Sequence, residues 1–307
     1  MTSGDASLGA ELNSISERLA GAGSESSRLN GRLLVAHALG LEMGAVLAHP
    51  ERILGPNELA RIHELVERRL AHEPMAHILG VKEFWSLPFQ VDKHTLTPRP
   101  DSESLIEAVL DWLGGGRLDE ELDILDMGTG SGALLLALLS ELPRARGLGT
   151  DISPEALALA RRNARALELD GRAGFALGDW GAGLDRYFHI ILANPPYVAG
   201  HELASLPPEI RLYEPLEALD GGPDGLDEYR RLVPQAGGLL HPRGGLFLEV
   251  GRDMAPKVAE IMTAQGFIRG GVRQDLARIE RVVWATRDEF NTAPANKSFC
   301  KPPKSAT

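Results

Sequence analysis

The feature that most constrains the fold is a regular alternation of short apolar segments and helical segments from about residue 102 onward. The predicted strands cover residues 122–127, 147–151, 173–177, 189–193, 245–250 and 281–285. The predicted helices cover about residues 102–113, 132–141, 154–168, 225–240 and 254–265. Apolar strands separated by helices are typical of a parallel sheet that is covered on both faces. The alternation therefore predicts an α/β domain.

The regions on either side of this alternation have different patterns. Residues 1–11 are small and polar and are predicted to be disordered. Residues 12–73 show helical periodicity without a strand pattern, which indicates a small all-helical N-terminal domain. Short apolar runs broken by Gly and Pro in residues 74–101 predict a β-hairpin and a linker. The α/β domain is expected to cover residues 102–288, and the polar tail 289–307 is predicted to be disordered.

Charge and composition exclude several classes of protein. The 32 Lys and Arg residues against 43 Asp and Glu residues give a net charge of -11, whereas a protein that binds phosphate backbones by bulk electrostatics is expected to be basic. The single cysteine, Cys300, excludes a disulfide framework and a Cys-rich zinc site. The nine histidines show no metal-ligand spacing, so no metal is expected. Without an apolar run of about 20 residues or a signal peptide, the chain is expected to be a cytoplasmic protein that binds neither membranes nor nucleic acid.

A glycine-rich segment follows the first predicted strand of the α/β domain. It consists of Gly128, Thr129, Gly130, Ser131 and Gly132. Alternate glycines let the backbone approach a ligand closely. The spacing is neither the dinucleotide pattern nor a P-loop, so the ligand need not carry phosphate. Asp151, at the end of the next strand, can accept hydrogen bonds from ribose hydroxyls. A nucleoside ligand of this kind favours S-adenosylmethionine over the alternative, a glycine-rich turn with an ordinary N-cap aspartate.

Asp179 and Trp180 follow the third predicted strand. There, the aspartate can accept a hydrogen bond from an adenine amino group, and the indole can stack on the ring. Taken by themselves, the two residues fit an exposed turn beside a packing tryptophan better.

The most specific motif is Asn194-Pro195-Pro196-Tyr197, directly after the fourth predicted strand. Two successive prolines fix an extended backbone and leave carbonyl groups without neighbouring N–H donors. The Asn194 side-chain oxygen and the Pro195 carbonyl can each accept one hydrogen of an NH₂ group, and Tyr197 offers a flat face to the group that carries it. The alternative is a rigid proline turn that ends the strand.

These motifs, together with others along the chain, resemble the PrmC/HemK family. The further matching segments lie at residues 73–80, 83–85, 97–103, 214–219, 221–226 and 248–251. The resemblance covers about residues 12–286, and Met127 departs from the leucine that is usual in the family. It implies a class I, Rossmann-like methyltransferase with a mainly parallel seven-stranded sheet, and S-adenosyl-L-methionine as the methyl donor. The expected reaction methylates the side-chain amide (N5) of the glutamine in the Gly-Gly-Gln motif of class 1 peptide chain release factors, which modulates translation termination.

The resemblance also implies roles for individual residues. The glycine loop, Asp151, Asp179 and Trp180 would bind the cofactor. Asn194 would contact both the cofactor and the glutamine amide. The residues expected to bind the substrate are Asn194, Pro195, Pro196 and Tyr197, and the catalytic ones are Asn194, Pro195 and Tyr197. Arg99 and Glu103 would cover the methionine end of the cofactor, although this segment also suits a helix start, and both roles can hold together.

The family resemblance further implies that the N-terminal helices are the docking surface for the release factor, and a monomer is expected. Two alternative functions remain. An N6-adenine nucleic-acid methyltransferase would use the same motif, but the net charge of -11 counts against it. A non-catalytic cofactor-binding adaptor would be favoured by a damaged Asn-Pro-Pro-Tyr motif, and here the motif is intact.

Overall fold

The computed structural model describes residues 7–24 and 26–287, so the tail predicted to be disordered at 289–307 lies outside the described residues. The chain divides into two compact units. The helical unit contains residues up to Val81 together with Pro207–Tyr213, and the α/β unit contains Lys82–Leu206 and the chain from Glu214 onward. Each unit is described separately below. In the described ranges, no helix is long and apolar enough to cross a membrane.

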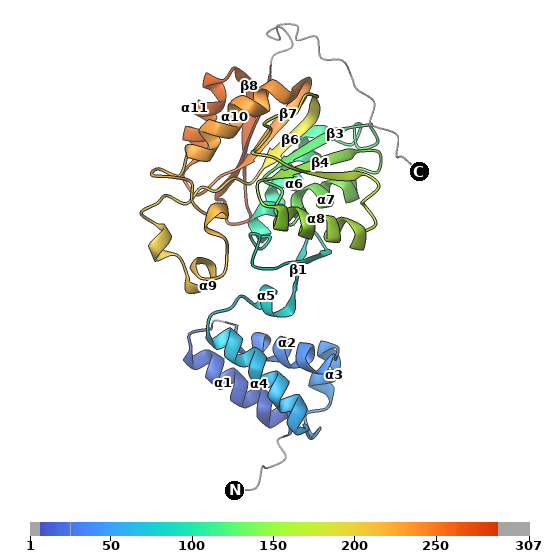
Figure 1. Cartoon of the computed structure of the whole chain (residues 1–307), viewed down its shortest axis with the longest axis vertical. Coiled ribbons are helices and arrows are strands. Elements are labelled where there is room, and N and C mark those ends of the chain that lie inside the picture. The colour runs from blue at the N-terminus through green and yellow to red at the C-terminus, as the bar shows by residue number, and fades with distance from the viewer. Residues whose placement is uncertain (1–6, 25, 288–307) are drawn as a thin grey trace. The chain divides into compact units, whose positions relative to one another are not determined.

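The helical unit is built from five helices near the N-terminus (Figure 1). They are α1 (Leu8–Gly21), α2 (Ser27–Leu39), α3 (Met43–Ala48), α4 (Pro56–Leu70) and α5 (Met75–Leu79). Ser7 caps α1, because its hydroxyl accepts a hydrogen bond from the Ala10 amide at 3.3 Å. Leu8 is fully buried in the core of this unit with Ile15 and Ile62. The helix therefore includes residues 8–11, which the sequence had assigned to a disordered N-terminus, because burial of Leu8 anchors its first turn.

A short segment distant in sequence completes the helical unit. It contains α9 (Pro208–Arg211). Arg69 forms an ion pair with Glu209 at 2.8 Å, and the Tyr213 hydroxyl donates to the Ala71 carbonyl at 2.8 Å. The alternation of strands and helices predicts that residues 207–213 belong to the α/β domain, whereas the structure groups them with the helical unit. That assignment is corrected, since contacts across about 140 residues leave no local pattern to detect.

The α/β unit contains a seven-stranded sheet in the order β5-β4-β3-β6-β7-β9-β8. The strands are β3 (Asp123–Met127), β4 (Arg146–Asp151), β5 (Ala173–Leu177), β6 (Phe188–Ala193), β7 (Leu240–Glu249), β8 (Phe267–Gln274) and β9 (Glu280–Arg287). Strand β9 is antiparallel to both of its neighbours, and the pairs from β5 to β7 are parallel. The prediction of a mainly parallel seven-stranded sheet is confirmed.

Strand β8 is the one strand of this sheet that the sequence analysis did not predict. Two consecutive glycines, Gly270 and Gly271, interrupt its apolar pattern. They lie against β9, where an added Cβ at Gly270 would be 2.0 Å from the Trp284 carbonyl oxygen. The close approach of β9 thus requires glycine where strand propensity is poor.

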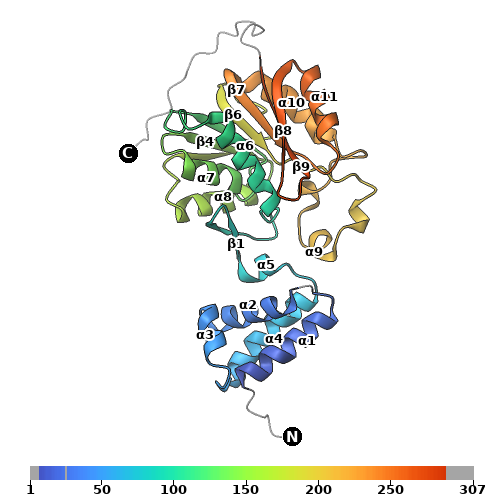
Figure 2. The same ribbon diagram turned by 180° about the vertical axis from the view of Figure 1, so that it is seen from behind.

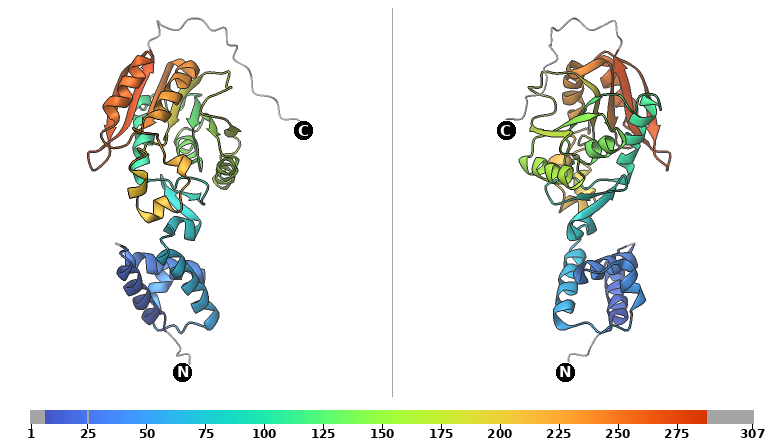
Figure 3. Two further views of the ribbon diagram at one scale, coloured as in Figure 1. Left: turned by 60° about the vertical axis from the view of Figure 1, so that its left-hand side comes forward. Right: turned by 90° about the vertical axis from the view of Figure 1, so that its right-hand side faces the viewer.

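Five helices cover the two faces of the sheet (Figure 1 and Figure 2). Helices α6 (Glu103–Leu113), α7 (Ala133–Glu141) and α8 (Pro154–Ala166) lie on one face, and α10 (Asp227–Leu239) and α11 (Ala255–Ala264) on the other. The left view in Figure 3 shows the two helical layers on opposite sides of the sheet. Successive strand residues point to opposite faces, so Ile124 and Ile190 contribute to one core and Leu125 and Ile191 to the other.

The predicted hairpin is present as β1 (Val81–Phe84) and β2 (Leu87–Gln90). Its two turn residues, Trp85 and Ser86, both have positive φ, as a two-residue hairpin turn requires. The buried rings of Phe84 and Phe89 pack edge to face, with centroids 6.2 Å apart. The 3-10 helix η1 (Pro100–Ser102) then leads into α6.

Candidate active site

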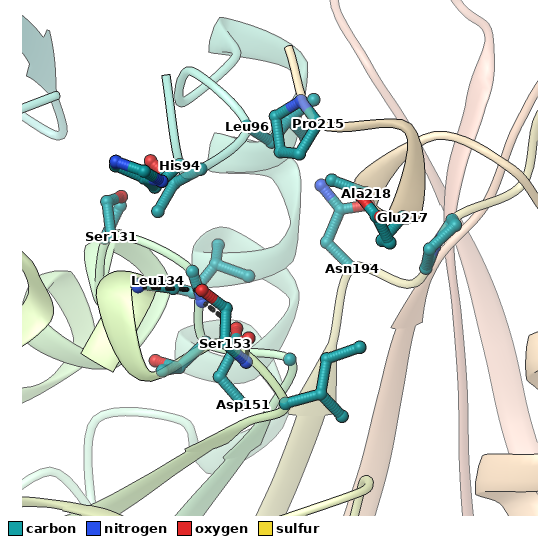
Figure 4. Close-up of a pocket in the computed structure, with 18 of the residues that line it drawn as sticks. His94, Leu96, Ser131, Leu134, Asp151, Ser153, Asn194, Pro215, Glu217 and Ala218 are labelled. Atoms are coloured by element: carbon teal, nitrogen blue, oxygen red, sulfur yellow. Dashed lines mark hydrogen bonds between the residues drawn. The ribbon is translucent and has the colours of Figure 1, made fainter. Parts of the chain in front are cut away.

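A cavity of about 780 Å³ lies in the α/β unit and is lined by residues that follow β3, β4, β5 and β6. The strand order reverses between β3 and β6, and ligands of open α/β sheets bind at such a point. Figure 4 shows Asp151 at the end of β4 and Asn194 after β6, both beside this cavity. The lining also includes residues from the loop 93–99 and from 215–218.

The glycine loop turns sharply between β3 and α7. The amides of Gly128 and Thr129 donate to the Thr150 carbonyl at 2.8 and 2.9 Å, which anchors the loop to the end of β4. Gly128 has a φ of 73°, and an added Cβ there would lie 2.9 Å from Cζ3 of Trp180. Gly128 is therefore required for both its backbone conformation and its contact with the indole.

Asp151 is held by backbone amides on both sides of its carboxylate. Oδ2 accepts from the Gly130 amide and Oδ1 from the Ser153 amide, each at 2.9 Å. Burial raises the pKa of Asp151, and these amide hydrogen bonds lower it. Each carboxylate oxygen has a further lone pair, so the fixed carboxylate can still accept hydrogen bonds from a ligand in the cavity.

A second carboxylate, Asp126, lies below the loop and was not predicted as a functional residue. It is fully buried, and Thr129 Oγ1 donates to its Oδ2 at 2.6 Å. Burial raises the pKa of Asp126 to about 7. An aspartate between Leu125 and Met127, directly before the glycine loop, was the sequence signal that could have singled it out.

Asp179 and Trp180 both line the cavity, and both are fixed by α10. Arg231 donates to Asp179 Oδ2 at 2.6 Å, and Trp180 Nε1 donates to Glu228 Oε2 at 2.9 Å. Asp179 and Trp180 thus have a structural role in the turn and also line the cavity, although the sequence presented these two roles as alternatives. An adenine amino group would share the Asp179 carboxylate with Arg231.

The four residues of the Asn-Pro-Pro-Tyr motif differ in whether they line the cavity. Asn194 and Pro196 line the cavity, while Pro195 and Tyr197 do not belong to the described lining. The Tyr197 ring packs among apolar residues and lies against Gly251, where an added Cβ would be 3.0 Å from Tyr197 Cδ2. Burial raises the pKa of Tyr197 to about 12. In this structure the ring packs against the core next to Gly251, and its predicted contact with the substrate stays a prediction.

Arg99 and Glu103, which were expected together at the cofactor, have different surroundings in the structure. Arg99 lines the cavity, and its Nη2 donates to both carboxylate oxygens of Glu214 at 2.7 and 2.6 Å. Burial raises the pKa of Glu214, while Arg99 lowers it. Glu103 is absent from the described lining; its carboxylate instead accepts a hydrogen bond from the Trp85 amide at 2.9 Å. Glu103 thus fixes the hairpin turn to the start of α6, and its role at the cofactor stays a prediction.

The volume of the cavity is in the usual range for a small-molecule site, and the chemistry of its lining fits S-adenosylmethionine. An added Cβ at Gly130 would have its nearest neighbour at 4.0 Å, so the loop is open toward the ligand. Asp151 supplies a fixed acceptor for hydroxyl groups, and Ile152, which is 60% exposed, supplies apolar surface beside it. No group of three or more potential metal-ligating residues occurs in the described part of the chain.

Two family models match the chain. The PrmC N-terminal domain matches residues 11–80, and the methyltransferase small domain matches residues 115–206. Among solved structures, the catalytic domain of hMettl16 in complex with the MAT2A 3'UTR hairpin 6 aligns with a TM-score of 0.57 and 16% identity, covering 72% of this chain and 84% of that one. A methyltransferase from Pyrococcus furiosus aligns with a TM-score of 0.50 and 16% identity, covering 76% of this chain and 100% of that one. These two structures share the fold.

Curated relatives match nearly the whole chain. The release factor glutamine methyltransferase of Rhodospirillum rubrum is 43% identical over 297 residues, covering 96% of this chain and 90% of the relative. The release factor glutamine methyltransferase of Moorella thermoacetica is 44% identical over 276 residues, covering 89% of this chain and 95% of the relative. Because these relatives are more than 40% identical over most of both chains, the chain belongs to the family of release factor glutamine methyltransferases, which use S-adenosylmethionine as methyl donor.

Proposed function

We propose that this chain methylates the side-chain amide nitrogen of the glutamine in the Gly-Gly-Gln motif of class 1 peptide chain release factors. The observation that carries the proposal is the cavity itself. It joins the glycine loop and Asp151 at one end to Asn194 and Pro196 at the other. When bound, S-adenosylmethionine supplies an electrophilic methyl group on a sulfonium centre. We also infer that the protein acts in the cytoplasm as a monomer and does not bind nucleic acid directly.

The cofactor would be held by residues from four strand ends and one loop. Asp151 would accept the ribose hydroxyls, and Trp180 and Asp179 would contact the adenine. The backbone of residues 128–132 would pass along the ligand. Arg99, oriented by Glu214, would cover the methionine end.

Asn194 would act on the acceptor nitrogen. A carboxamide nitrogen is a weak nucleophile because its lone pair is delocalised into the carbonyl group. The Asn194 side-chain oxygen, with the Pro195 carbonyl as a second acceptor, would orient the NH₂ group and stabilise the positive charge that develops on nitrogen. A strong base is unnecessary, since the attached proton becomes acidic once the nitrogen–methyl bond forms and can leave to water.

The helical unit would recognise the release factor. Helix α4 carries the charged residues Arg61, Glu64, Glu67 and Arg68. Glu67 pairs with Arg18, and Arg68 pairs with Glu73. Arg61 and Glu64 are exposed and have no such ion pair among the described residues. We therefore assign the contact with the release factor chiefly to these two side chains.

The reaction is tested by mass spectrometry of a purified release factor incubated with the protein and methyl-labelled S-adenosylmethionine. The expected product carries one methyl group on the glutamine of the Gly-Gly-Gln motif. An adenine-containing oligonucleotide is incubated in parallel. Label on the adenine and none on the release factor would favour the N6-adenine methyltransferase instead.

Recognition by α4 is tested with the substitution Arg61→Glu. It should lower kcat/KM on the intact release factor by about tenfold and leave a short Gly-Gly-Gln peptide unaffected, because a charge at the edge of an interface acts mainly on encounter. Lys257→Glu, a charge reversal at another exposed position, on α11, is the matched control. Equal losses with both variants would argue against a docking role for α4.

A further inference from the structure

Three polar side chains meet behind the Asn-Pro-Pro-Tyr motif. Strands β6 and β7 are parallel with Ala193 paired to Leu248, so the next residues, Asn194 and Glu249, continue the same register. Residues paired in this way point to the same face of a sheet. Ser102, the last residue of η1, approaches from the segment that precedes α6. The sheet order therefore brings together residues 102, 194 and 249.

The three side chains form a small hydrogen-bonded cluster. Asn194 Nδ2 donates to Ser102 Oγ at 3.4 Å. Ser102 and Asn194 both lower the pKa of the Glu249 carboxyl, which places their polar groups next to it. Glu249 is only 2% exposed, and its Oε2 has no hydrogen-bond partner in the described part of the chain. Burying a carboxylate with an unused oxygen is costly.

We propose that Glu249 is a positioning residue for methyl transfer, which fixes the Asn194 amide so that its oxygen faces the cavity. This inference rests on the proposed role of Asn194. A carboxamide can rotate by 180°, which exchanges its oxygen and its NH₂ group. An ionised carboxylate only accepts hydrogen bonds, so it selects the orientation in which Asn194 Nδ2 faces Glu249 and Ser102. The opposite orientation would present an NH₂ group to the NH₂ group of the substrate.

Protonation of Glu249 would remove this selection, because a carboxylic acid can also donate. Burial raises the pKa of Glu249 to about 7, and hydrogen bonds from Ser102 and Asn194 act against this. Among the charged neighbours, Arg281 of β9 lowers this pKa and Asp101 of η1 raises it. Two tyrosines also face the group, Tyr197 and Tyr229; the latter donates its hydroxyl to the Glu249 carbonyl at 2.7 Å. The turnover rate should therefore fall as the pH falls through about 7.

The orientation itself is tested without any substrate. In the ¹⁵N-labelled protein, the side-chain amide resonances of Asn194, assigned by their loss in Asn194→Ser, are followed from pH 5.5 to 8.5. They should shift with a midpoint near pH 7 in the wild type and lose this titration in Glu249→Gln. Tyr229→Phe is the matched control, since it removes a buried hydrogen bond to the same residue and leaves the carboxylate in place. Asn194 resonances that are the same in Glu249→Gln as in the wild type at every pH would overturn the proposal.

Kinetics provide the second test. Glu249→Gln should lower kcat on the release factor by about tenfold or more, the usual effect of a misplaced catalytic group. The affinity for S-adenosylmethionine should stay within about twofold, and the loss of rate at low pH should disappear. Ser102→Ala should show a smaller loss of kcat and keep the pH dependence. If Tyr229→Phe loses as much kcat as Glu249→Gln, Glu249 supports the fold only, and the proposal is wrong. A wild-type protein that methylates no release factor would refute the proposed function, while the resonance titration would still decide the role of Glu249.

Discussion

The two ends of the cavity are built in different ways. At the β3–β4 end, backbone groups make the decisive hydrogen bonds: the Gly130 amide holds Asp151, and the Thr150 carbonyl holds the glycine loop. At the β6–β7 end, the groups are side chains from three distant segments: Asn194 donates to Ser102, and both lower the pKa of Glu249. The first arrangement depends on about 25 consecutive residues, whereas the second depends on the order of strands in the sheet.

This difference matches the tasks of the two ends. Binding a cofactor requires fixed dipoles and space, which a glycine-rich backbone supplies directly. Orienting a reacting amide requires one side-chain oxygen at a defined position, which in turn needs a supporting shell of side chains. Substitutions at the first end should therefore change mainly affinity, and substitutions at the second end mainly rate.

The largest effect is expected for Asn194→Ala. It should lower kcat by about 100-fold or more, on the scale of losing one transition-state hydrogen bond in other enzymes, and retain most of the cofactor affinity. Single-turnover measurements with saturating S-adenosylmethionine provide the rate. A rate within about tenfold of the wild type, or 1.4 kcal/mol in the barrier, would show that this end of the cavity does not govern the rate.

Asp151→Ala should have the opposite effect, because the lost hydrogen bonds are made in the ground state. The affinity for S-adenosylmethionine should fall by about 1.5–3 kcal/mol for each ribose hydrogen bond at most, while kcat at saturation changes less. Calorimetric titration measures the affinity. Equal dissociation constants for variant and wild type would remove Asp151 from the ribose site.

The pH dependence of stability should expose one buried carboxylate at each end. Burial raises the pKa of both Asp126 and Glu249 to about 7, above their unfolded values. At low pH each carboxyl is protonated in both states, and its protonated form is the one that the folded protein favours. As the pH rises from the unfolded pKa to about 7, burial of the group becomes increasingly unfavourable, and the stability that it contributes is lost. The free energy of unfolding should therefore fall between pH 5 and 8, by an amount on the order of 2 kcal/mol per group.

Urea unfolding of the cofactor-free protein at pH 5 and at pH 8 measures this change in the free energy of unfolding. Asp126→Asn and Glu249→Gln should each make the unfolding free energy less dependent on pH, and the double variant should flatten it further. A steeper dependence in either variant would contradict the assignment of that carboxylate.

The smallest effect is expected from a pair of glycine substitutions in the loop. Gly128→Ala and Gly130→Ala both place alanine at positive φ, but only Gly128→Ala brings its Cβ to 2.9 Å from Trp180. Gly128→Ala should thus be less stable than Gly130→Ala by about 1 kcal/mol, the cost of modest overpacking. Thermal unfolding without cofactor compares the two, and equal stabilities would mean that the indole moves aside freely.

Much of the fold was predictable because it follows from short-range patterns of apolar, Gly and Pro residues. Six strands of the large sheet, the hairpin and the helices that cover the sheet follow from apolar periodicity and from Gly and Pro positions. Strand β8 was missed because contact with β9 requires glycines there. The start of α1 was missed because the burial of Leu8 outweighs the polar composition around it.

The sequence by itself determined the glycine loop, Asp151 and the Asn-Pro-Pro-Tyr motif, since each lies directly after an apolar strand and parallel strands end at one edge of a sheet. Only the tertiary structure decided which motif residues line the cavity. It placed Asn194 and Pro196 in the lining, turned Tyr197 into the core and tied Glu103 to the hairpin. It also brought Glu249 and Ser102 to Asn194, and residues 207–213 to the helical unit. The physical reason is that hydrogen bonds between side chains distant in sequence form only once the strand order and register have fixed their positions.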